Sequence, residues 1–262
     1  MSASVYPQLV TGVTSQFPIV KKRRPRTVAN TAADGSSIKL ADPAGEIVGW
    51  RLQYTNLCDA ELAALQQFFT DKEGSLTTFT FLDPTANLLA WSEVLTNAAW
   101  EAEPYLALSG NAADPLGGGN AWRLENSGQA AQSLAQTLNV PTSYTYCFSV
   151  YAWSSQAVTM QLQLGSTLAR FALGAQWKRV RITGTGGATG TAVEFGIQLP
   201  AGATICVFGP QAEAQPSPSA YKSATTGGVY ESARFRDDIF ALTSTDVNHH
   251  SATVNILYAN SL

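Results

Sequence analysis

The sequence predicts a mainly β protein in which a β-rich domain with one helix is interrupted by an inserted β-sandwich. Between residues 87 and 225, short runs alternate apolar and polar residues and are bounded by Gly, Pro, Ser and Asn, which is typical of half-buried strands. The composition changes at Asp83-Pro84 and again after the linker-like stretch 215–228. The segment beyond that stretch is too short to fold alone, so it is expected to complete the first domain.

The first flank contains a strand, a helix and a second strand. The run IVGWRLQYTN at 47–56 alternates in polarity, which predicts a strand. Apolar residues recur at helical spacing over about 59–71, and Asp59 stands where an N-cap is expected. The run LTTFTFLD at 76–83 predicts the second strand. Residues 1–30, with their prolines, are expected to form an irregular arm.

These patterns set the domain limits. Residues 1–86 and 226–262 are expected to form one discontinuous domain, and residues 87–225 an inserted jelly-roll sandwich, because loop tips tolerate added domains. The eight strands expected in the sandwich cover residues 121–126, 133–140, 144–153, 158–165, 169–174, 178–185, 192–200 and 204–213.

The arm carries the basic run KKRRPR. The expected role of this run is contact with a neighbouring subunit, and the alternative is a nucleic-acid or localisation signal. The remaining sequence is acidic in balance, with a net charge of -3 overall, so no nucleic-acid partner is expected. The candidate contact residues are Lys21, Lys22, Arg23, Arg24 and Arg26. No apolar run is long enough to cross a bilayer, so no membrane insertion is expected.

The sequence offers little for catalysis. The two histidines, His249 and His250, are adjacent and are expected in a solvent-facing turn; they make a poor metal site. Glu101 and Glu103 leave a glycoside hydrolase open as the weaker alternative, since such enzymes use paired carboxylates. We therefore expect no enzyme activity, no catalytic residues and no cofactor. The sequence assigns no metal-binding residues, and it leaves open whether calcium stabilises the sandwich.

A binding face is better supported. In YTYCFSVYAW, alternate residues face the core, which presents Tyr151 and Trp153 outward, and the same argument applies to neighbouring strands. Aromatic rings stack on the apolar faces of sugars, while amides and guanidinium groups bond to hydroxyls. The alternative is a face that packs on the first domain or on another subunit. The candidate carbohydrate-binding residues are Tyr151, Trp153, Gln161, Gln163, Arg179, Arg181, Glu194 and Gln198.

Four motifs of the inserted segment resemble a carbohydrate-binding-module-like sandwich found in phage virion proteins. In order they are NLLAWSEVLTNAAW, YTYCFSVYAW, WKRVRITGT and VFGPQAEAQPSPSAY. The turn AQWKR departs from the Gly-Trp-Tyr-Arg type turn of that family. The flanks are similar to phage distal-tail proteins of the tail tip or baseplate hub, in the WRLQY strand, the EL..L..FF helix, FTFLDP and ARFRDD.

The resemblance implies a setting. Distal-tail proteins form hexameric rings between the tail tube and the tip, often with an outward inserted sandwich. The implied partners are further copies of the chain, the tube and hub proteins, and a host surface glycan. The protein would be assembled in the host cytoplasm and reside in the virion. The alternatives are a free-standing glycan-binding adhesion module and the glycoside hydrolase already mentioned.

Overall fold

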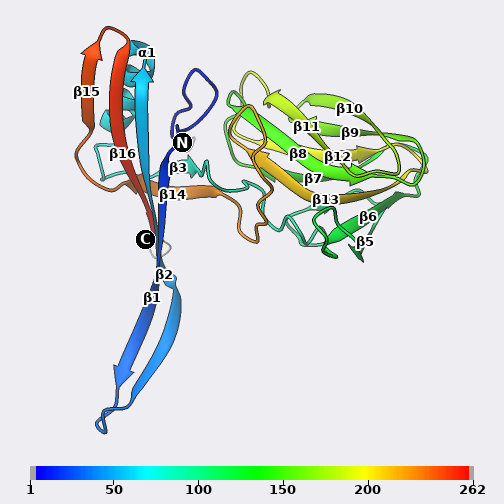
Figure 1. Cartoon of the computed structure of the whole chain (residues 1–262), viewed down its shortest axis with the longest axis horizontal. Coiled ribbons are helices and arrows are strands. Elements are labelled where there is room, and N and C mark those ends of the chain that lie inside the picture. Colours follow the sequence, from blue (N-terminus) through cyan, green and yellow to red (C-terminus); the bar gives the residue numbers. More distant parts are fainter. Residues whose placement is uncertain (1–3, 260–262) are drawn as a thin grey trace. The chain divides into compact units, whose positions relative to one another are not determined.

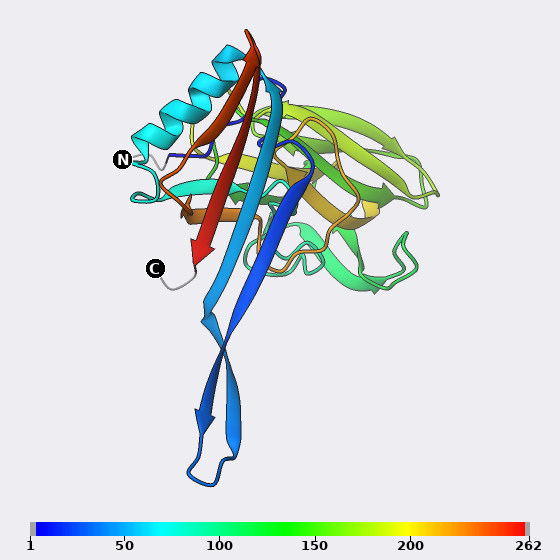
Figure 2. The ribbon, with the colours of Figure 1, turned by 60° about the vertical axis from the view of Figure 1, so that its left-hand side comes forward.

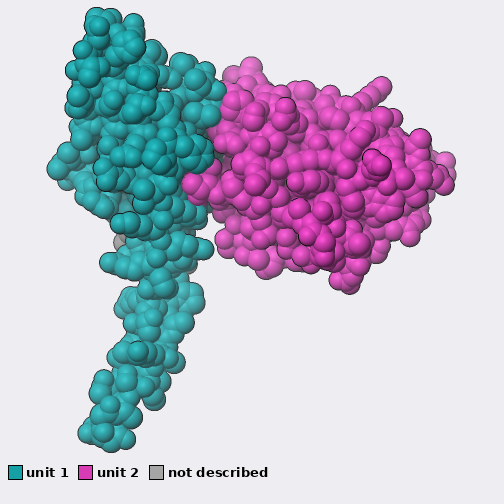
Figure 3. Space-filling model, in the orientation of Figure 1, with its two compact units in different colours: residues 1–82, 229–262 teal, residues 83–228 magenta. Residues whose placement is uncertain are grey.

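The computed structural model describes residues 4–259, which are mainly β with one helix, and this confirms the predicted fold class (Figure 1). The chain divides into two compact units (Figure 3). Unit 1 comprises residues 1–82 and 229–262, and unit 2 comprises residues 83–228. The sequence placed the corresponding limits at 87 and 225.

Unit 1 is assembled from two stretches of the chain, and unit 2 from one continuous stretch between them. Unit 1 contains β1 Ile19–Thr31, β2 Ser37–Leu57, α1 Asp59–Asp71, β3 Phe79–Leu82, β14 Val229–Phe235, β15 Ala241–Asp246 and β16 His249–Ala259. Unit 2 contains β4 Glu101–Ala102, β5 Leu106–Ala112, β6 Ala121–Asn126, β7 Gln132–Leu138, β8 Thr145–Trp153, β9 Val158–Leu164, β10 Thr167–Leu173, β11 Lys178–Thr185, β12 Val193–Leu199 and β13 Thr204–Glu213.

Unit 1 is a six-stranded antiparallel sheet with one face covered. The strand order is β1-β2-β16-β14-β3, and β15 pairs with β16. Along β2, Trp50, Leu52 and Tyr54 are buried while Arg51 between them is exposed, as the two-residue period of a strand requires. The buried side packs with Leu65 of α1 and with an aromatic cluster. This cluster contains Tyr6, Phe68, Phe79, Phe81 and Phe235.

The start of α1 differs from the prediction. The N-cap is Cys58, and Asp59 is the first helical residue. The carboxylate of Asp59 accepts a hydrogen bond from His250 Nε2 at 2.6 Å, and this bond holds the pKa of Asp59 below its usual range. The expectation of a solvent-facing histidine turn was therefore wrong for His250, which is buried, although His249 is exposed.

The basic arm is not irregular. β1 and β2 form a long hairpin whose outer half extends past the other strands of the sheet (Figure 2). The prediction of an irregular arm was wrong here because a segment with Pro25 and five cations lacks the composition typical of a strand. Pro25 lies where the pairing register shifts, between Arg24 and Arg26, so its missing N–H does not interrupt regular pairing. β1 is also an edge strand, where charged residues are tolerated.

Unit 2 is a jelly-roll β-sandwich of two five-stranded antiparallel sheets. Sheet D has the strand order β10-β9-β12-β7-β4, and sheet E has the order β11-β8-β13-β6-β5. Phe148 from sheet E and Phe195 from sheet D meet in the core, with ring centroids 5.8 Å apart. Strands β4 and β5 were not expected. In β5 the pairing register with β6 shifts between Ser109 and Ala112, where Asn111 has a positive φ.

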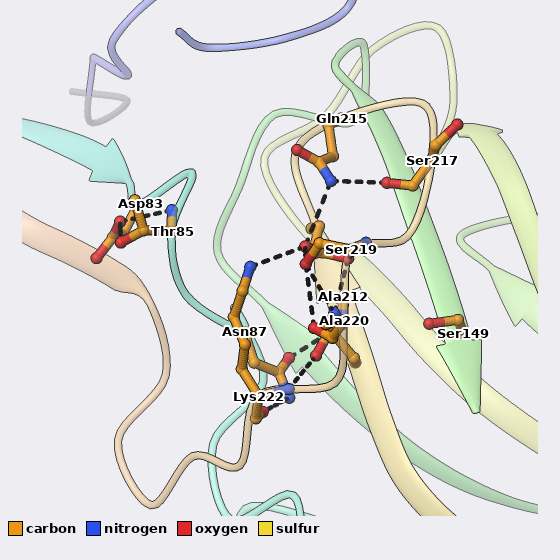
Figure 4. Close-up of polar contacts among 12 residues, drawn as sticks. Asp83, Thr85, Asn87, Ser149, Ala212, Gln215, Ser217, Ser219, Ala220 and Lys222 are labelled. Atoms are coloured by element: carbon orange, nitrogen blue, oxygen red, sulfur yellow. Dashed lines mark hydrogen bonds and ion pairs between the residues drawn. The ribbon is translucent and has the colours of Figure 1, made fainter. Parts of the chain in front are cut away.

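Asn87 ties the beginning of unit 2 to its last strand (Figure 4). Its buried side chain donates to Pro210 O at 2.9 Å and accepts from the backbone N–H groups of Leu89 and Ala212 at 3.1 and 3.0 Å. A buried amide with these three partners fixes the first residues of unit 2 against β13. The change in composition at Asp83-Pro84 therefore lies a few residues before Asn87, where hydrogen bonds fix the beginning of the sandwich.

We predict that Asn87→Ala lowers the free energy of unfolding by about 2–4 kcal/mol, because it leaves three buried backbone groups without a partner. Chemical denaturation followed by fluorescence measures the change. The matched control is Asn120→Ala, at an exposed side chain, with an expected change within about 0.5 kcal/mol. Equal effects of the two substitutions would contradict the role given to Asn87.

Candidate binding surfaces

The eight predicted carbohydrate-binding residues face away from the core, but they do not form one surface. Tyr151 and Trp153 lie on β8, and Arg179 and Arg181 on β11, both in sheet E. The other four lie on β9 and β12 of sheet D, the opposite layer; they are Gln161, Gln163, Glu194 and Gln198. The single platform was therefore wrong, since alternation shows which side chains point outward but not which sheet a strand joins.

The outer face of sheet D has no ring for a sugar to stack on. Gln161 Nε2 donates to Gln198 Oε1 at 3.0 Å, and Gln163 Nε2 donates to Gly165 O at 3.1 Å, so these amides bond within the chain. The outward positions of its described strands carry no aromatic side chain. Glu103, considered for hydrolysis, accepts the Ser133 backbone N–H at the edge of this sheet.

The outer face of sheet E gathers aromatic and cationic side chains in rows across the strands. Arg179, Tyr151 and Phe208 are cross-strand neighbours in one row. The guanidinium carbon of Arg179 lies 5.3 Å from the Tyr151 ring centroid, within the range of a cation–π contact. The next row contains Trp153, Cys206 and Arg123. The sequence missed the residues from β6 and β13 because the pairing of β13 with β8, and of β6 with β13, joins segments far apart in the sequence.

Residues 215–222 cover part of this face (Figure 4). Arg179 donates to Ser219 O and, at 3.0 Å, to Ser149 Oγ. Lys222 donates its backbone N–H to Gln211 Oε1 at 2.8 Å, and Ser149 and Gln211 are fully buried. The stretch predicted as a linker is thus a packed cover. The guanidinium of Arg179 is committed to holding it, rather than being free for a ligand.

The open part of the face leads into a pocket of about 670 Å³ beside Trp153. Its walls are Trp153, Arg123, Cys206 and the turns 154–158 and 200–204. Ser154 Oγ donates to Thr204 O at 2.8 Å and so joins the two turns. The indole N–H of Trp153 is buried and has no acceptor within the described residues.

The lining of the pocket combines an aromatic ring with polar groups. Its lining residues, all in the described part of the chain, include no carboxylate and no histidine. Burial raises the pKa of the Cys206 thiol, which disfavours the reactive thiolate. What remains is the aromatic ring of Trp153 and the guanidinium of Arg123, which forms an exposed ion pair with Glu125 at 2.8 Å. This set suits stacking and hydrogen bonding to a polar ligand.

The five predicted subunit-contact residues all lie on β1, and their side chains alternate between the two faces of the hairpin. Lys21 lies over the ring of Trp50, with Nζ 5.6 Å from its centroid. Arg23 pairs with Glu46 at 2.8 Å and Arg26 with Asp42 at 3.5 Å. Lys22 and Arg24 point to the other face, and no carboxylate within residues 4–259 forms an ion pair with either.

No family model and no curated protein matches the chain. Among solved structures, the enzymatically active domain of bacteriophage CBA120 tailspike protein 4 is 8% identical, with a TM-score of 0.39 over 51% of this chain and 22% of that domain. The CBM22-1 xylan-binding domain of Paenibacillus barcinonensis Xyn10C is 11% identical, with a TM-score of 0.40 over 50% of this chain and 94% of that domain.

The module TmCBM61, in complex with β-1,4-galactotriose, is 12% identical, with a TM-score of 0.38 over 49% of this chain and 98% of that module. Similarities this low establish no shared function. Within residues 4–259, no helix is long and apolar enough to span a membrane. The same residues contain no group of three or more His, Cys, Asp or Glu side chains placed to hold a metal ion.

We predict that Arg179→Ala loosens the cover. Without the guanidinium, residues 219–222 lose an anchor, so hydrogen exchange at the Lys222 amide should accelerate by about ten-fold or more. Mass-spectrometric hydrogen exchange measures this. Arg181→Ala, at an exposed position of the same strand, is the matched control and should leave that exchange unchanged. Protection of Lys222 that survives in Arg179→Ala would contradict the anchoring role.

Proposed function

We propose that the chain is a structural subunit of a phage tail tip, in which unit 1 assembles with further copies into a ring and unit 2 displays a glycan-binding face. The observation that carries this proposal is the long β1–β2 hairpin. Residues 24–47 of the hairpin pair with each other along most of their length, while β16 pairs with β2 only from residue 47 onward.

A two-stranded ribbon is marginally stable alone in water. The outer half of the hairpin has no third strand among the described residues, and its Ile38 and Leu40 are 63% and 55% exposed. Such a segment gains stability by packing on a further surface, and the described part of the unit 1 sheet provides no third strand for it. Association with another copy is the simplest source of that surface, and repeated head-to-tail contacts form a ring when their rotation closes.

The edge of the hairpin favours contact through side chains rather than through strand addition. Pro25 offers no backbone N–H, the register shifts at this residue, and the flanking cations repel an identical edge. Lys22 and Arg24 are then available to bind carboxylates of a neighbour. The six-fold ring, the tube and hub partners, assembly in the host cytoplasm and the position in the virion belong to this proposal, and they rest on the resemblance of the flanks to distal-tail proteins.

The glycan-binding part of the proposal rests on the pocket beside Trp153. A half-buried indole ring next to a guanidinium group and two polar turns combines a stacking surface for a sugar ring with hydrogen-bonding groups for its hydroxyls. The same pocket would also serve a free-standing adhesion module. The oligomeric state of the chain separates that alternative from the ring subunit.

We predict that removing the outer hairpin abolishes self-association without unfolding unit 1. Residues 25–46 are replaced with Asn-Gly, a two-residue turn that closes the paired Arg24 and Ile47. Sedimentation velocity should show a monomer, with the free energy of unfolding changed by about 1 kcal/mol or less.

The matched control keeps the outer hairpin and shortens only its tip. In this variant, Asn-Gly replaces residues 32–36 between the paired Thr31 and Ser37. This variant should assemble as the wild type does. Assembly of the variant that lacks residues 25–46 would overturn the role of the hairpin.

We predict that Trp153→Ala lowers glycan affinity by about ten-fold or more, because the stacking surface is lost, and leaves assembly unchanged. A glycan array with the full-length chain identifies a binder, and calorimetry measures its affinity for each variant. Gln161→Ala, on the opposite sheet, is the control with unchanged affinity. An array without any bound glycan, or full binding by Trp153→Ala, would exclude this site.

A further inference from the structure

The uncovered face of the unit 1 sheet contains a groove of about 490 Å³. Pairing places Val20 opposite Arg51 and Lys22 opposite Gly49, so these four residues share the face that points away from α1. Because Gly49 has no side chain, the groove is deeper at this position. Thr253, Asn255 and Arg236 complete the lining.

This face is strongly basic. In addition to Lys22 and Arg51, it carries Arg24, Arg234 and Arg236, because Arg234 pairs with Leu257 on the outer side of β16. Only Arg236 has an ion pair among the described residues, with Asp237 at 3.1 Å. The Nε of Arg234 is buried without a partner. The KKRRPR run is thus part of a larger basic surface, which the sequence alone did not reveal.

The opposite charge gathers at the carboxyl end of α1. Asp71 and Glu73 are exposed there, and Asp238 joins them by accepting hydrogen bonds from Ser75 N and Oγ at 2.8 and 2.7 Å. Carboxylates are unfavourable at this end because the helix dipole is negative there, and the last turn of α1 has no basic residue. Lys72, the C-cap, lies over the Phe68 ring. We call Asp71, Glu73 and Asp238 the acidic end.

Two apolar side chains project beside these carboxylates. Leu76 is 66% exposed and Ile239 is 76% exposed. The groove on the other side of the sheet has the opposite charge. It contains the exposed apolar side chain of Val20 among cations, which complements apolar side chains among carboxylates. α1 packs on the covered face of the sheet, whereas the groove is on the uncovered face, so one copy cannot bring the two surfaces together.

We propose that the basic groove of one copy binds the acidic end of α1 of a second copy, with Leu76 and Ile239 inserted between the flanking charges. The inference rests on the self-assembly proposed above and names the two surfaces that carry it. Because the two surfaces differ, the contact is heterologous, and it generates a ring when its rotation closes. The groove is also continuous with the base of the hairpin, through Lys22 and Arg24.

The test uses charge reversal in the full chain. A groove variant carries Lys22→Glu and Arg51→Glu, and an end variant carries Asp71→Lys and Glu73→Lys, all at exposed positions. Each variant alone places like charges against each other and should associate on the order of ten-fold or more weakly than the wild type. An equal mixture restores opposite charges at every contact, so sedimentation velocity should show assembly close to that of the wild type.

The outcomes separate the two proposals. If both variants assemble like the wild type, or if the mixture remains dissociated while each variant keeps the wild-type thermal unfolding curve, the docking inference is overturned and the hairpin-based assembly stands. If the wild type itself is monomeric at concentrations on the order of 100 µM, self-assembly and the docking inference both fail. Unchanged assembly with loss of binding to a single-stranded oligonucleotide in the groove variant would assign the basic face to a polyanion instead.

Discussion

A six-stranded sheet with only one covered face is the constraint on which unit 1 depends. α1 and the N-terminal residues Tyr6 and Leu9 bury one side of β2 and β16, and residues 4–259 provide no second helix for the other side. The alternation along β2 follows from this, with Trp50, Leu52 and Tyr54 inward and Arg51 outward. An antiparallel sheet tolerates such an uncovered face when its outward side chains are polar. In unit 1 they include the cations Lys22, Arg24, Arg51 and Arg234. The proposed docking assigns this charge to the binding of an acidic neighbour.

The length of β1 and β2 adds a second feature to the sheet of unit 1. β1 and β2 are longer than the sheet needs, so their outer halves leave the core as a ribbon. The ribbon and the basic face share the strand β1, which places both proposed assembly surfaces on one continuous element. In unit 2, residues 215–222 fold back over part of the outer face of sheet E, and the pocket beside Trp153 stays open.

Local patterns predicted the local structure. The helix at 59–71 and the strand at 144–153 follow from apolar spacing, and alternation correctly placed Tyr151 and Trp153 outward. Long-range pairing was not predictable in this way. The alternating glutamines of β9 do not indicate that this strand joins the sheet opposite β8. In β1, the charged residues and Pro25 are atypical of a strand, so the sequence did not predict one there. The basic face likewise combines residues from three distant segments, so only the pairing of β1, β2, β16 and β14 reveals it.

The most direct test of self-assembly is the molar mass of the full-length chain in solution, measured by light scattering during size exclusion. The account predicts self-association, and a six-fold ring would give a discrete particle with a mass near six times 27.8 kDa. The particle should dissociate as salt is raised toward about 1 M, where the screening length falls to about 3 Å. A mass of 27.8 kDa at every concentration and salt condition would contradict it and favour a free-standing binding module.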